Sequence, residues 1–574
     1  MSDRVVETDI LVIGGGGAGC IAALEAARRG AEVLIVSKDL LGHGNTMIAG
    51  GGFSAPFGHM EQGDDLNTHF KDTIESGEFI NNQELAWILV REAKRTALQL
   101  EREGLIFKRI PGKGDKYYAY KLGGHGYARV LKPGLGIEYG MVMKEAILKL
   151  GIEHMDEVMV TELLETDGTV VGAMGVDIEK GVFLIFRANC VILATGGLGE
   201  IFAHTTNVKF STGDGYSMAY RAGAELVDME MIQFIPLGLT HPPALLGRHV
   251  GEPGYAGPHG KLLNAKGERI MEKYDPIRME YTTRAIMSRA IAIEVKEGRG
   301  TEHGGCLLDL TENKKYSDGQ RHLEEMRRHQ WHGLEIIRSV YGERAAEFDE
   351  PWDVYPTQHY TMGGVKINEW GETKVPSLYA VGEASGGIHG ANRLGGNSLC
   401  EVFVFGRRVG RRAAKRAKSM GRLLAVDMEK VEGERERVYN ILDREEGVHP
   451  SEIRGELRKT IWDYVGVLRN GEGLGYALNR ILELQDKLSL LQTTSKSTRY
   501  NMEWIEALET YNMVNAAEMV TRAALIRTET RGGHCREDYQ QMDNKNWLKN
   551  IVINLEDGRM NVDVRSTLLT RLRP

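Results

Sequence analysis

The sequence predicts an α/β protein, because short apolar runs typical of buried parallel strands alternate with helical patterns at the start of the chain. Residues 8–13 (TDILVI) and 31–38 (AEVLIVSK) are the first two such runs, and the helical pattern between them ends at Gly30. Two further runs, 189–197 and 377–387, lie far along the chain. One sheet is therefore expected to be assembled from distant segments.

A glycine-rich turn joins the first predicted strand to the first helix. Gly14, Gly16 and Gly19 match the pattern GxGxxG, between a strand and a helix that leads to a second strand. In that context the glycines allow a tight turn, a close approach to a pyrophosphate and close helix–strand packing. Ser37 and Lys38 replace the usual acidic ribose ligand. This argues against a plain NAD domain and is compatible with a flavin protein.

Glycine content supports the same interpretation. Of the 70 glycines, 59 lie in residues 1–415 and 11 in residues 416–574. The first share is well above the usual one of about 7%. Because glycine permits tight turns and close approach to a ligand, such contacts are expected in the first part of the chain.

Changes in composition divide the chain into three predicted parts. A discontinuous Rossmann-like nucleotide-binding domain is expected at 1–234 and 351–415. An inserted α+β capping domain is expected at 235–350, where the sequence contains HPP, GEPGYAGPHG and several charged helical stretches. From 416 to 574 charged helical patterns predict a C-terminal helical domain.

Charge and cysteine usage limit the classes of partner. A net charge of −8 and a pI of about 6.1 argue against general polyanion binding, so no nucleic-acid partner is expected. No cysteine belongs to a CxxC pair, so we predict no zinc ribbon, no iron–sulphur cluster and no other metal in this chain. Scattered thiols suit a reducing, cytoplasmic compartment. The uncharged stretch 10–24 is too short to span a bilayer, which leaves membrane association to a partner.

Longer motifs run through almost the whole chain. They include NTMIAGGG (45–52), STGDGYSMAYRAGA (211–224), TTRAIMSRAI (282–291), HYTMGGV (359–365), HGANRLGGNSL (389–399) and RTETRGGHCREDY (527–539). With these motifs the chain resembles the flavoprotein subunits of the succinate dehydrogenase/fumarate reductase family, which also contains L-aspartate oxidase.

The resemblance implies FAD bound across the first domain. The implied contacts are Gly14, Gly16, Gly17, Ala18 and Gly19 at the pyrophosphate, Ser37 and Lys38 at the ribose, Asn45, Thr46, Gly50, Gly51 and Gly52 along the flavin, and Asp214, Glu383, Asn397, Ser398 and Leu399 as further contacts. Covalent members carry the flavin on a histidine where this chain has Asn45. Dissociable FAD is therefore expected, and with it a lower potential that favours reduction of a double bond or action as an oxidase over efficient succinate oxidation.

The resemblance also implies three catalytic residues. Arg284 aligns with the arginine that transfers a proton to substrate carbon, and His359 and Arg393 align with residues that clamp a carboxylate. An arginine is a poor acid, since its pKa is above 12, and needs a buried proton relay. The planar guanidinium of an arginine suits a carboxylate bidentately.

Three departures from the family pattern concern the residues that would bind the other end of the substrate. Ile235 replaces a carboxylate-binding histidine, Ala285 replaces a relay aspartate, and the family's Thr-Glu pair is missing from a longer loop. The expected substrate keeps one carboxylate at Arg393 and His359 and has a different or bulkier group at a less polar end. The loop offers four candidate replacements: Arg248, His249, His259 and Lys261.

Three functions follow from these residues. The first is the catalytic flavoprotein subunit of an enzyme that reduces or forms an activated C=C bond of a small carboxylate, with electrons exchanged through an iron–sulphur partner. The second is an enzyme like L-aspartate oxidase. The third is an electron-transfer or scaffold subunit with a degenerate pocket. The basic stretch 406–418 is either a surface for the partner or a solvated helix face.

Overall fold

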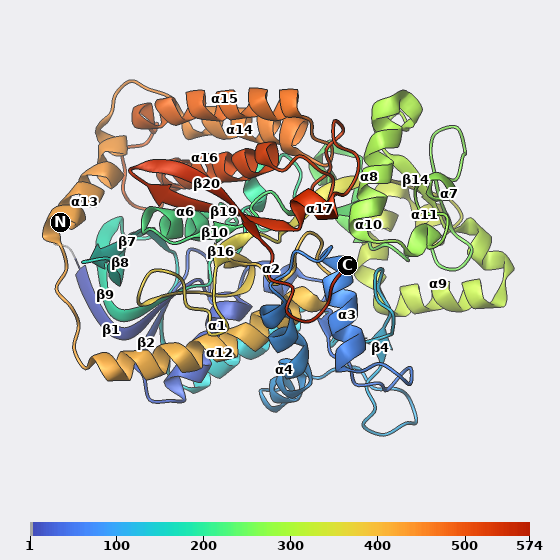
Figure 1. Ribbon diagram of the computed structural model, residues 1–574, viewed down its shortest axis with the longest axis horizontal. Helices are drawn as coiled ribbons and strands as arrows, with labels where there is room; N and C mark the ends of the chain where they lie inside the picture. Colours follow the sequence, from blue (N-terminus) through green and yellow to red (C-terminus); the bar gives the residue numbers. More distant parts are fainter. Residues whose placement is uncertain (1–3) are drawn as a thin grey trace.

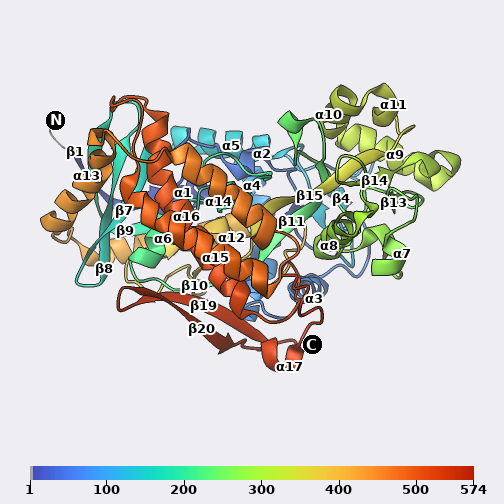
Figure 2. The same ribbon diagram turned by 90° about the horizontal axis from the view of Figure 1, so that it is seen from above.

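The structure is a computed structural model that describes residues 4–574, the side chain of His329 excepted. The capping region, with helices α8–α11, lies at one end of the molecule and the N-terminus at the other (Figures 1 and 2). Helices α13–α16 lie over the nucleotide-binding part. The predicted combination of an α/β domain, a capping region and a helical C-terminal part is confirmed.

A seven-stranded sheet forms the centre of the first domain, in the order β6-β2-β1-β9-β8-β7, with β17 pairing with β9. The strands β6, β2, β1, β9 and β17 pair in parallel, whereas β7 and β8 form antiparallel pairs. Their bounds are β1 (Arg4–Ile13), β2 (Val33–Val36), β6 (Glu153–Met155), β7 (Val158–Thr166), β8 (Thr169–Asp177), β9 (Val182–Leu193) and β17 (Leu378–Ala380). One sheet is thus built from segments that lie far apart in the sequence.

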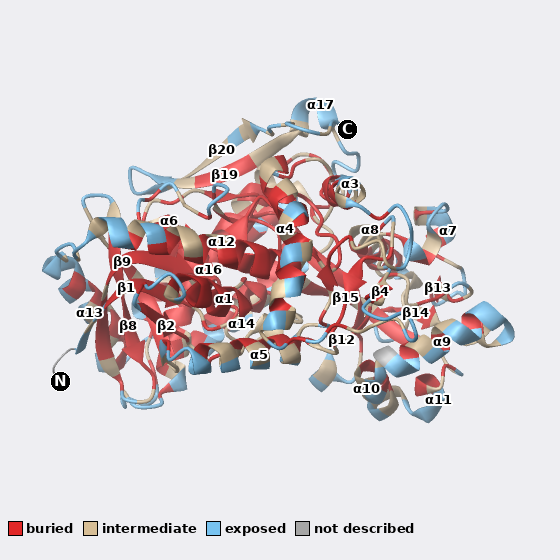
Figure 3. Cartoon of the chain, turned by 90° about the horizontal axis from the view of Figure 1, so that it is seen from below, coloured by how far each residue is buried: buried red, intermediate tan, exposed pale blue. Residues whose placement is uncertain are grey.

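Helices α1 and α12 pack against each other and against this sheet, and their buried residues, with those of α16, belong to the same large apolar core (Figure 3). The apolar side chains of the parallel strands are buried on both faces, as covering helices require. The helices of this part are α1 (Gly17–Ala27), α2 (Asn45–Ile48), α3 (Leu66–Ser76), α4 (Gln83–Arg102), α5 (Gly136–Lys149), α6 (Asp214–Arg221) and α12 (Asn397–Met420). A three-stranded sheet, β3 (Phe53–Ser54), β5 (Val130–Leu131) and β4 (Ala119–Tyr120), lies beside them.

The capping region has its own antiparallel sheet, in the order β12-β11-β15-β14-β13, and its own apolar core. Its strands are β11 (Ile232–Leu239), β12 (His249–Gly251), β13 (Lys261–Leu263), β14 (Cys306–Asp309) and β15 (Trp352–Thr361). Its helices are α7 (Met271–Tyr274), α8 (Arg284–Glu294), α9 (Ser317–His329), α10 (Trp331–Tyr341) and α11 (Glu343–Ala346). The sheet takes β15 from the segment that the sequence assigned to the nucleotide-binding domain, and α12 runs across the predicted boundary at 415/416.

The C-terminal part begins with four helices and ends in a β-hairpin. The helices are α13 (Met428–Asp443), α14 (Pro450–Val465), α15 (Gly471–Lys487) and α16 (Met502–Ile526), followed by the short α17 (Asn544–Trp547). Strands β19 (Lys549–Glu556) and β20 (Arg559–Ser566) join β10 (Leu226–Val227), β16 (Gly364–Lys366) and β18 (Ser385–Gly386) in one sheet.

This hairpin departs from the expected all-helical segment. The two-residue turn is Asp557-Gly558, and both residues have positive φ, the conformation of a tight hairpin turn. Ile551, Val552 and Ile553 are all buried in the middle of β19, a short apolar run typical of a strand covered on both faces. The signal was thus present in the sequence, but only pairing with β10 makes the hairpin part of the protein's core.

Among the described residues, the chain contains no helix that is both long enough and apolar enough to cross a membrane.

Candidate active site

A cavity of about 750 Å³ opens where the parallel strands β1, β2 and β9 end. It runs from the glycine turn after β1 to the capping region, whose loop before and through β12 and helix α8 form part of the wall. Open α/β sheets bind their ligands at this carboxyl edge. The cavity brings together most of the residues that the sequence singled out.

The glycine turn forms one end of the cavity. Gly14 has φ +115°, and a Cβ there would lie 2.2 Å from the Ala194 carbonyl oxygen. A Cβ on Gly19 would lie 1.9 Å from the Gly14 carbonyl oxygen. Helix α1 begins at Gly17 and its N-cap residue, Gly16, supplies no side-chain hydrogen bond, so the first N–H groups of the helix are available to an anion.

Lys38 closes this end of the cavity with a network of ion pairs. Its Nζ donates to Asp214 Oδ2 at 2.7 Å and to Glu509 Oε1 at 2.6 Å. Burial opposes the charge of Lys38, but the two carboxylates outweigh it and raise the pKa. The cation is therefore neutralised by the protein itself. Glu509 lies on α16, so the C-terminal part contributes to this end.

The middle of the cavity is lined by α2, by residues 50–52 and by the start of α12. Asn45 Nδ2 donates to Asn207 Oδ1 at 3.2 Å, and its Oδ1 accepts from the Val208 amide at 3.0 Å. Ser398 and Leu399 lie in the first turn of α12, whose N-cap, Gly396, makes no side-chain hydrogen bond. Two helix N-termini thus point to the same cavity. Burial raises the pKa of Glu383, also in the wall, to about 7.

Two predicted cofactor residues do not line the cavity. Asn397 is fully buried, and its amide bonds His69 Nε2 at 2.9 Å and Thr73 Oγ1 at 3.0 Å. It joins α12 to α3, which corrects its expected place at the cofactor. Gly19 contacts the turn rather than the cavity, as the packing glycine of the pattern. The other predicted cofactor residues all line the cavity: Gly14, Gly16, Gly17, Ala18, Ser37, Lys38, Asn45, Thr46, Gly50, Gly51, Gly52, Asp214, Glu383, Ser398 and Leu399.

The residues present fit FAD. The cavity is long and polar at the glycine turn, side-chain-free along residues 50–52, and faced by two helix N-termini. The buried Oγ1 of Thr195 in its wall has no hydrogen-bond partner among the described residues, as expected where a ligand supplies one.

Arg284 is held at the capping side of the cavity by three hydrogen bonds. It is the first residue of α8, after the N-cap Thr283, whose side chain accepts from the Ile286 amide. Its Nε donates to Glu252 Oε2 at 2.8 Å, and its Nη2 bonds the other oxygen of Glu252. Its Nη1 donates to Gln233 Oε1 at 2.7 Å. This bidentate pair fixes the guanidinium in one orientation.

His359 lies opposite, on β15. Its Nδ1 is 2.7 Å from Thr206 Oγ1, and its carbonyl oxygen accepts from Asn207 Nδ2 at 2.9 Å. Burial lowers the pKa of His359 well below its usual value, and the charges of Arg284 and Arg393 lower it further. The neutral ring is therefore the form expected at neutral pH, able to donate a hydrogen bond.

Arg393 is a buried cation beside another cation. Its guanidinium lies 4.6 Å from the centroid of the Tyr360 ring, and its Nε has no hydrogen-bond partner among the described residues. Burial and then the charge of Arg284 lower the pKa of Arg393 to about 10. Its carbonyl oxygen accepts from Gln233 Nε2 at 2.8 Å, so Gln233 connects the two arginines. An anion would stabilise such a group.

The expected less polar end is corrected by the structure. Ile235 is fully buried on β11, where it pairs with Thr357, and it does not line the cavity. The wall contains Lys132, Arg248 and His249 instead. Burial lowers the pKa of Lys132 to about 8, and that of His249 to about 4. This part of the cavity is basic because its wall comes from other segments, which supply the cations Lys132 and Arg248.

Two of the four candidate replacements in the loop lie elsewhere. His259 Nε2 pairs with Asp318 Oδ1 at 2.9 Å on the surface. Lys261 is part of β13, opposite Asp309. Arg248 and His249 line the cavity, and the His249 ring centroid is 6.1 Å from that of His359.

Glu252 is the residue that the sequence interpretation missed. It follows a glycine in the loop where a Thr-Glu pair was sought, and the only signal was an acidic residue in a loop rich in basic ones. Burial opposes its ionisation, but Arg284 outweighs that effect and lowers the pKa of Glu252. Its partnership with Arg284 depends on a contact across 32 residues.

Comparisons with known proteins agree with this geometry. Residues 9–399 match the model of an FAD binding domain, and residues 454–574 match the C-terminal domain of fumarate reductase flavoproteins. The chain is 41% identical over 566 residues to a fumarate reductase (CoM/CoB) subunit of Methanothermobacter marburgensis, covering 96% of this chain and 98% of that protein.

Solved structures give the same result. A mutant form of the Escherichia coli quinol fumarate reductase protein FrdA matches with a TM-score of 0.90 and 29% identity, covering 100% of this chain and 98% of that chain. Mycobacterium smegmatis Sdh1 in complex with UQ1 matches with a TM-score of 0.86 and 33% identity, covering 99% and 95%.

Fold, cavity and comparisons together define an FAD-dependent oxidoreductase that acts on CH–CH bonds. The chain belongs to the fumarate reductase/succinate dehydrogenase flavoprotein family, as its catalytic flavoprotein subunit.

Proposed function

We propose that this chain reduces the C=C bond of fumarate or a closely similar small dicarboxylate. The observation that carries the proposal is the Arg284–Glu252 pair, set in the same wall as His359 and Arg393. A cation that cannot easily lose its proton is there held by a buried carboxylate. That arrangement suits delivery of a proton at a fixed place.

Different residues are proposed to bind the two ends of the substrate. Arg393 and His359 bind one carboxylate, and Lys132 with His249 binds the other. This replaces the expectation of a bulkier, less polar group by that of a second anionic group. Charge-assisted hydrogen bonds of this kind are the stronger ones in proteins.

The cavity-lining residues named above would hold FAD, which, once reduced by the electron partner, would supply the hydride for one carbon of the double bond. Arg284 donates a proton from its guanidinium to the neighbouring carbon, and Glu252 helps to restore that proton. One hydride and one proton convert C=C into CH–CH. Gln233 is bonded to both arginines and so fixes the position of the proton donor, Arg284, relative to Arg393, which binds the carboxylate.

The cavity-lining residues named above are proposed to hold FAD, with the N-termini of α1 and α12 facing its charged groups. Asn45 is bonded to Asn207 and Val208 and offers no nucleophile to the flavin, so dissociable FAD is expected. If the protein is precipitated with acid, the yellow colour should stay in solution. Colour retained in the washed pellet would contradict this.

An iron–sulphur protein is proposed as the electron partner, because the five cysteines of this chain are free, buried and far apart in sequence. The relative from Methanothermobacter marburgensis is named as part of a fumarate reductase (CoM/CoB), and FrdA as part of a quinol fumarate reductase. Free thiols suit a reducing compartment, so we propose the cytoplasmic side, with membrane association through partners.

The test uses purified full-length protein with FAD and a reduced dye as electron donor. Fumarate should be reduced better than unsaturated monocarboxylates, and L-aspartate with oxygen should give no comparable turnover. Arg284→Ala should lower turnover by about 1,000-fold or more while FAD stays bound.

Arg289→Ala, on the same helix but outside the cavity wall, is the matched control and should keep near wild-type turnover. Unchanged turnover in Arg284→Ala would contradict catalysis by this site and favour a scaffold role. Preference for a monocarboxylate would contradict the two-ended binding.

A further inference from the structure

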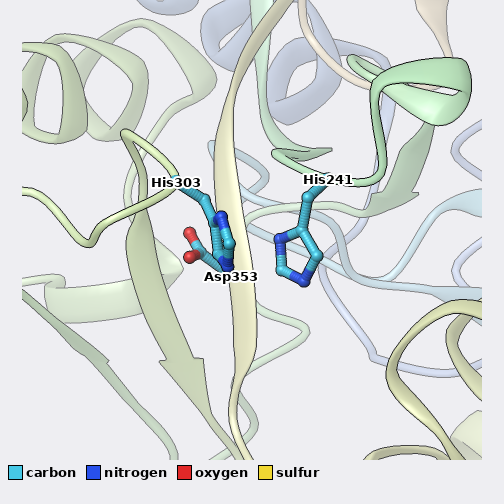
Figure 4. Close-up of side chains that lie close together, drawn as sticks. All are labelled: His241, His303 and Asp353. Carbon is cyan, nitrogen blue, oxygen red and sulfur yellow. The ribbon is translucent and has the colours of Figure 1, made fainter.

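Three potential metal ligands meet in the capping region, away from the active-site cavity. His241 follows β11, His303 lies in the loop between α8 and β14, and Asp353 is the second residue of β15. Each side chain offers one ligand atom, and these atoms all lie within 4.8 Å of one another (Figure 4). None of the three lines the active-site cavity.

Asp353 supplies a buried oxygen without a partner. The residue is 6% exposed, and its Oδ2 accepts a hydrogen bond from Thr301 Oγ1 at 2.6 Å. Its Oδ1 has no partner among the described residues. A buried polar atom left in this state is costly unless something binds it. A Cβ on Gly305 would lie 2.2 Å from this oxygen, so a side chain at that position would displace the carboxylate.

The two histidines face each other beside that carboxylate. Their ring centroids are 3.9 Å apart, at an interplanar angle of 34°. The Thr240 hydroxyl donates to the Asp353 carbonyl oxygen at 3.4 Å and lies 3.1 Å from His241 Nδ1. It can therefore accept the Nδ1 proton, which leaves the Nε2 lone pair free. Such outer hydrogen bonds fix the tautomer of a histidine ligand.

We propose that His241, His303 and Asp353 form a binding site for a divalent transition-metal ion of the zinc class. Two imidazoles and one carboxylate are the donors that zinc prefers, whereas calcium and magnesium prefer oxygen donors alone. Bond lengths of about 2.0–2.2 Å require ligand atoms about 3.4 Å apart, so the three side chains, whose ligand atoms now lie within 4.8 Å of one another, would move closer when the metal binds. The partly exposed histidines leave a fourth position to water.

The metal would tie together three segments of the capping region. These are the end of β11, the loop that follows α8 and the start of β15. The elements next to these segments also carry active-site residues: Gln233 on β11, Arg284 at the start of α8 and His359 on β15. The site is therefore a structural link within the capping region and takes no part in the redox step.

The experiment uses the full-length holoprotein, treated with a chelator and then dialysed against zinc alone. We expect about one zinc ion per chain and a higher thermal midpoint with zinc. His303→Ala should weaken zinc binding by about 100-fold or more, and Thr301→Val by about 10-fold. His303 has an exposed side chain, so its removal should not prevent folding. Asp353→Asn should also weaken binding.

His154→Ala is the control, because this partly exposed histidine on β6 lies in the nucleotide-binding domain. It should bind zinc as the wild type does. The proposal is overturned if the wild type takes up no zinc, or if His303→Ala binds it equally well. An equal rise in thermal midpoint with calcium would overturn the assignment to the zinc class.

Discussion

The two ends of the active-site cavity treat positive charge in opposite ways. At the glycine turn, Lys38 is bonded to two carboxylates, and its pKa is raised. At the capping side, burial lowers the pKa values of Arg393 to about 10 and Lys132 to about 8. The first end is neutralised by the protein itself. The second keeps buried cations in excess, which is the arrangement expected where the ligand brings the negative charge.

Of the variants that test this difference between the two ends, Arg393→Met should have the largest effect. It removes the buried cation that an anionic substrate would pair with, so kcat/KM should fall by about 1,000-fold. The thermal midpoint without substrate should not fall, because the guanidinium is buried and its Nε has no partner among the described residues. Kinetics and thermal unfolding of the FAD-loaded protein test both points. A lower midpoint with unchanged kinetics would show a structural role instead.

Glu252→Gln separates proton transfer from carboxylate binding. The amide keeps the size of the side chain but cannot return a proton to Arg284. We expect kcat to fall by about 100-fold, with little change in KM. Steady-state rates across pH provide the measurement. A change in KM alone would place Glu252 in substrate binding.

Lys132→Met tests the second anionic group of the substrate. KM should rise by roughly 10-fold with kcat little changed. In the wild type, KM should also rise as pH increases through about 8, because Lys132 loses its charge there. In the variant that increase should disappear. If the pH profile of KM is the same in both proteins, Lys132 does not bind substrate.

Lys38→Met changes the other end and should have the smallest effect on turnover. It leaves Asp214 without its cation and Glu509 with Arg454 alone, so the free energy of unfolding should fall by roughly 3 kcal/mol. FAD affinity should fall, while kcat at saturating FAD should stay close to the wild-type value. Calorimetry and FAD titration measure these effects. A large loss of kcat at saturating FAD would mean that the two ends are not independent.

Much of the site could be predicted, because it depends on short local patterns. The spacing of the glycine turn is a local pattern, and Gly19 has no room for a side chain because the Gly14 carbonyl lies five residues before it; the carbonyl that crowds Gly14 belongs to the distant Ala194. Arg284, His359 and Arg393 came from motif context, and all three line the cavity. Asn397 came from the same kind of context and faces α3 instead. One position along a helix turn changes which way a side chain points.

The rest depended on contacts between distant segments. Glu252 pairs with Arg284 across a loop whose length differs from the family pattern. Ile235 lost its expected role because the strand register turns it into the core. His241, His303 and Asp353 have no common spacing, so no motif could have joined them.

The sequence by itself determined the α/β class, the nucleotide turn and the family, since periodicity and glycine placement act over a few residues. Only the tertiary structure decided which charges face each other. Lys38 pairs with Glu509 on α16, and Arg284 pairs with Glu252. The Nε of Arg393 has no partner among the described residues. The energy of a charge depends on its burial and its neighbours, and both are set by how distant segments pack.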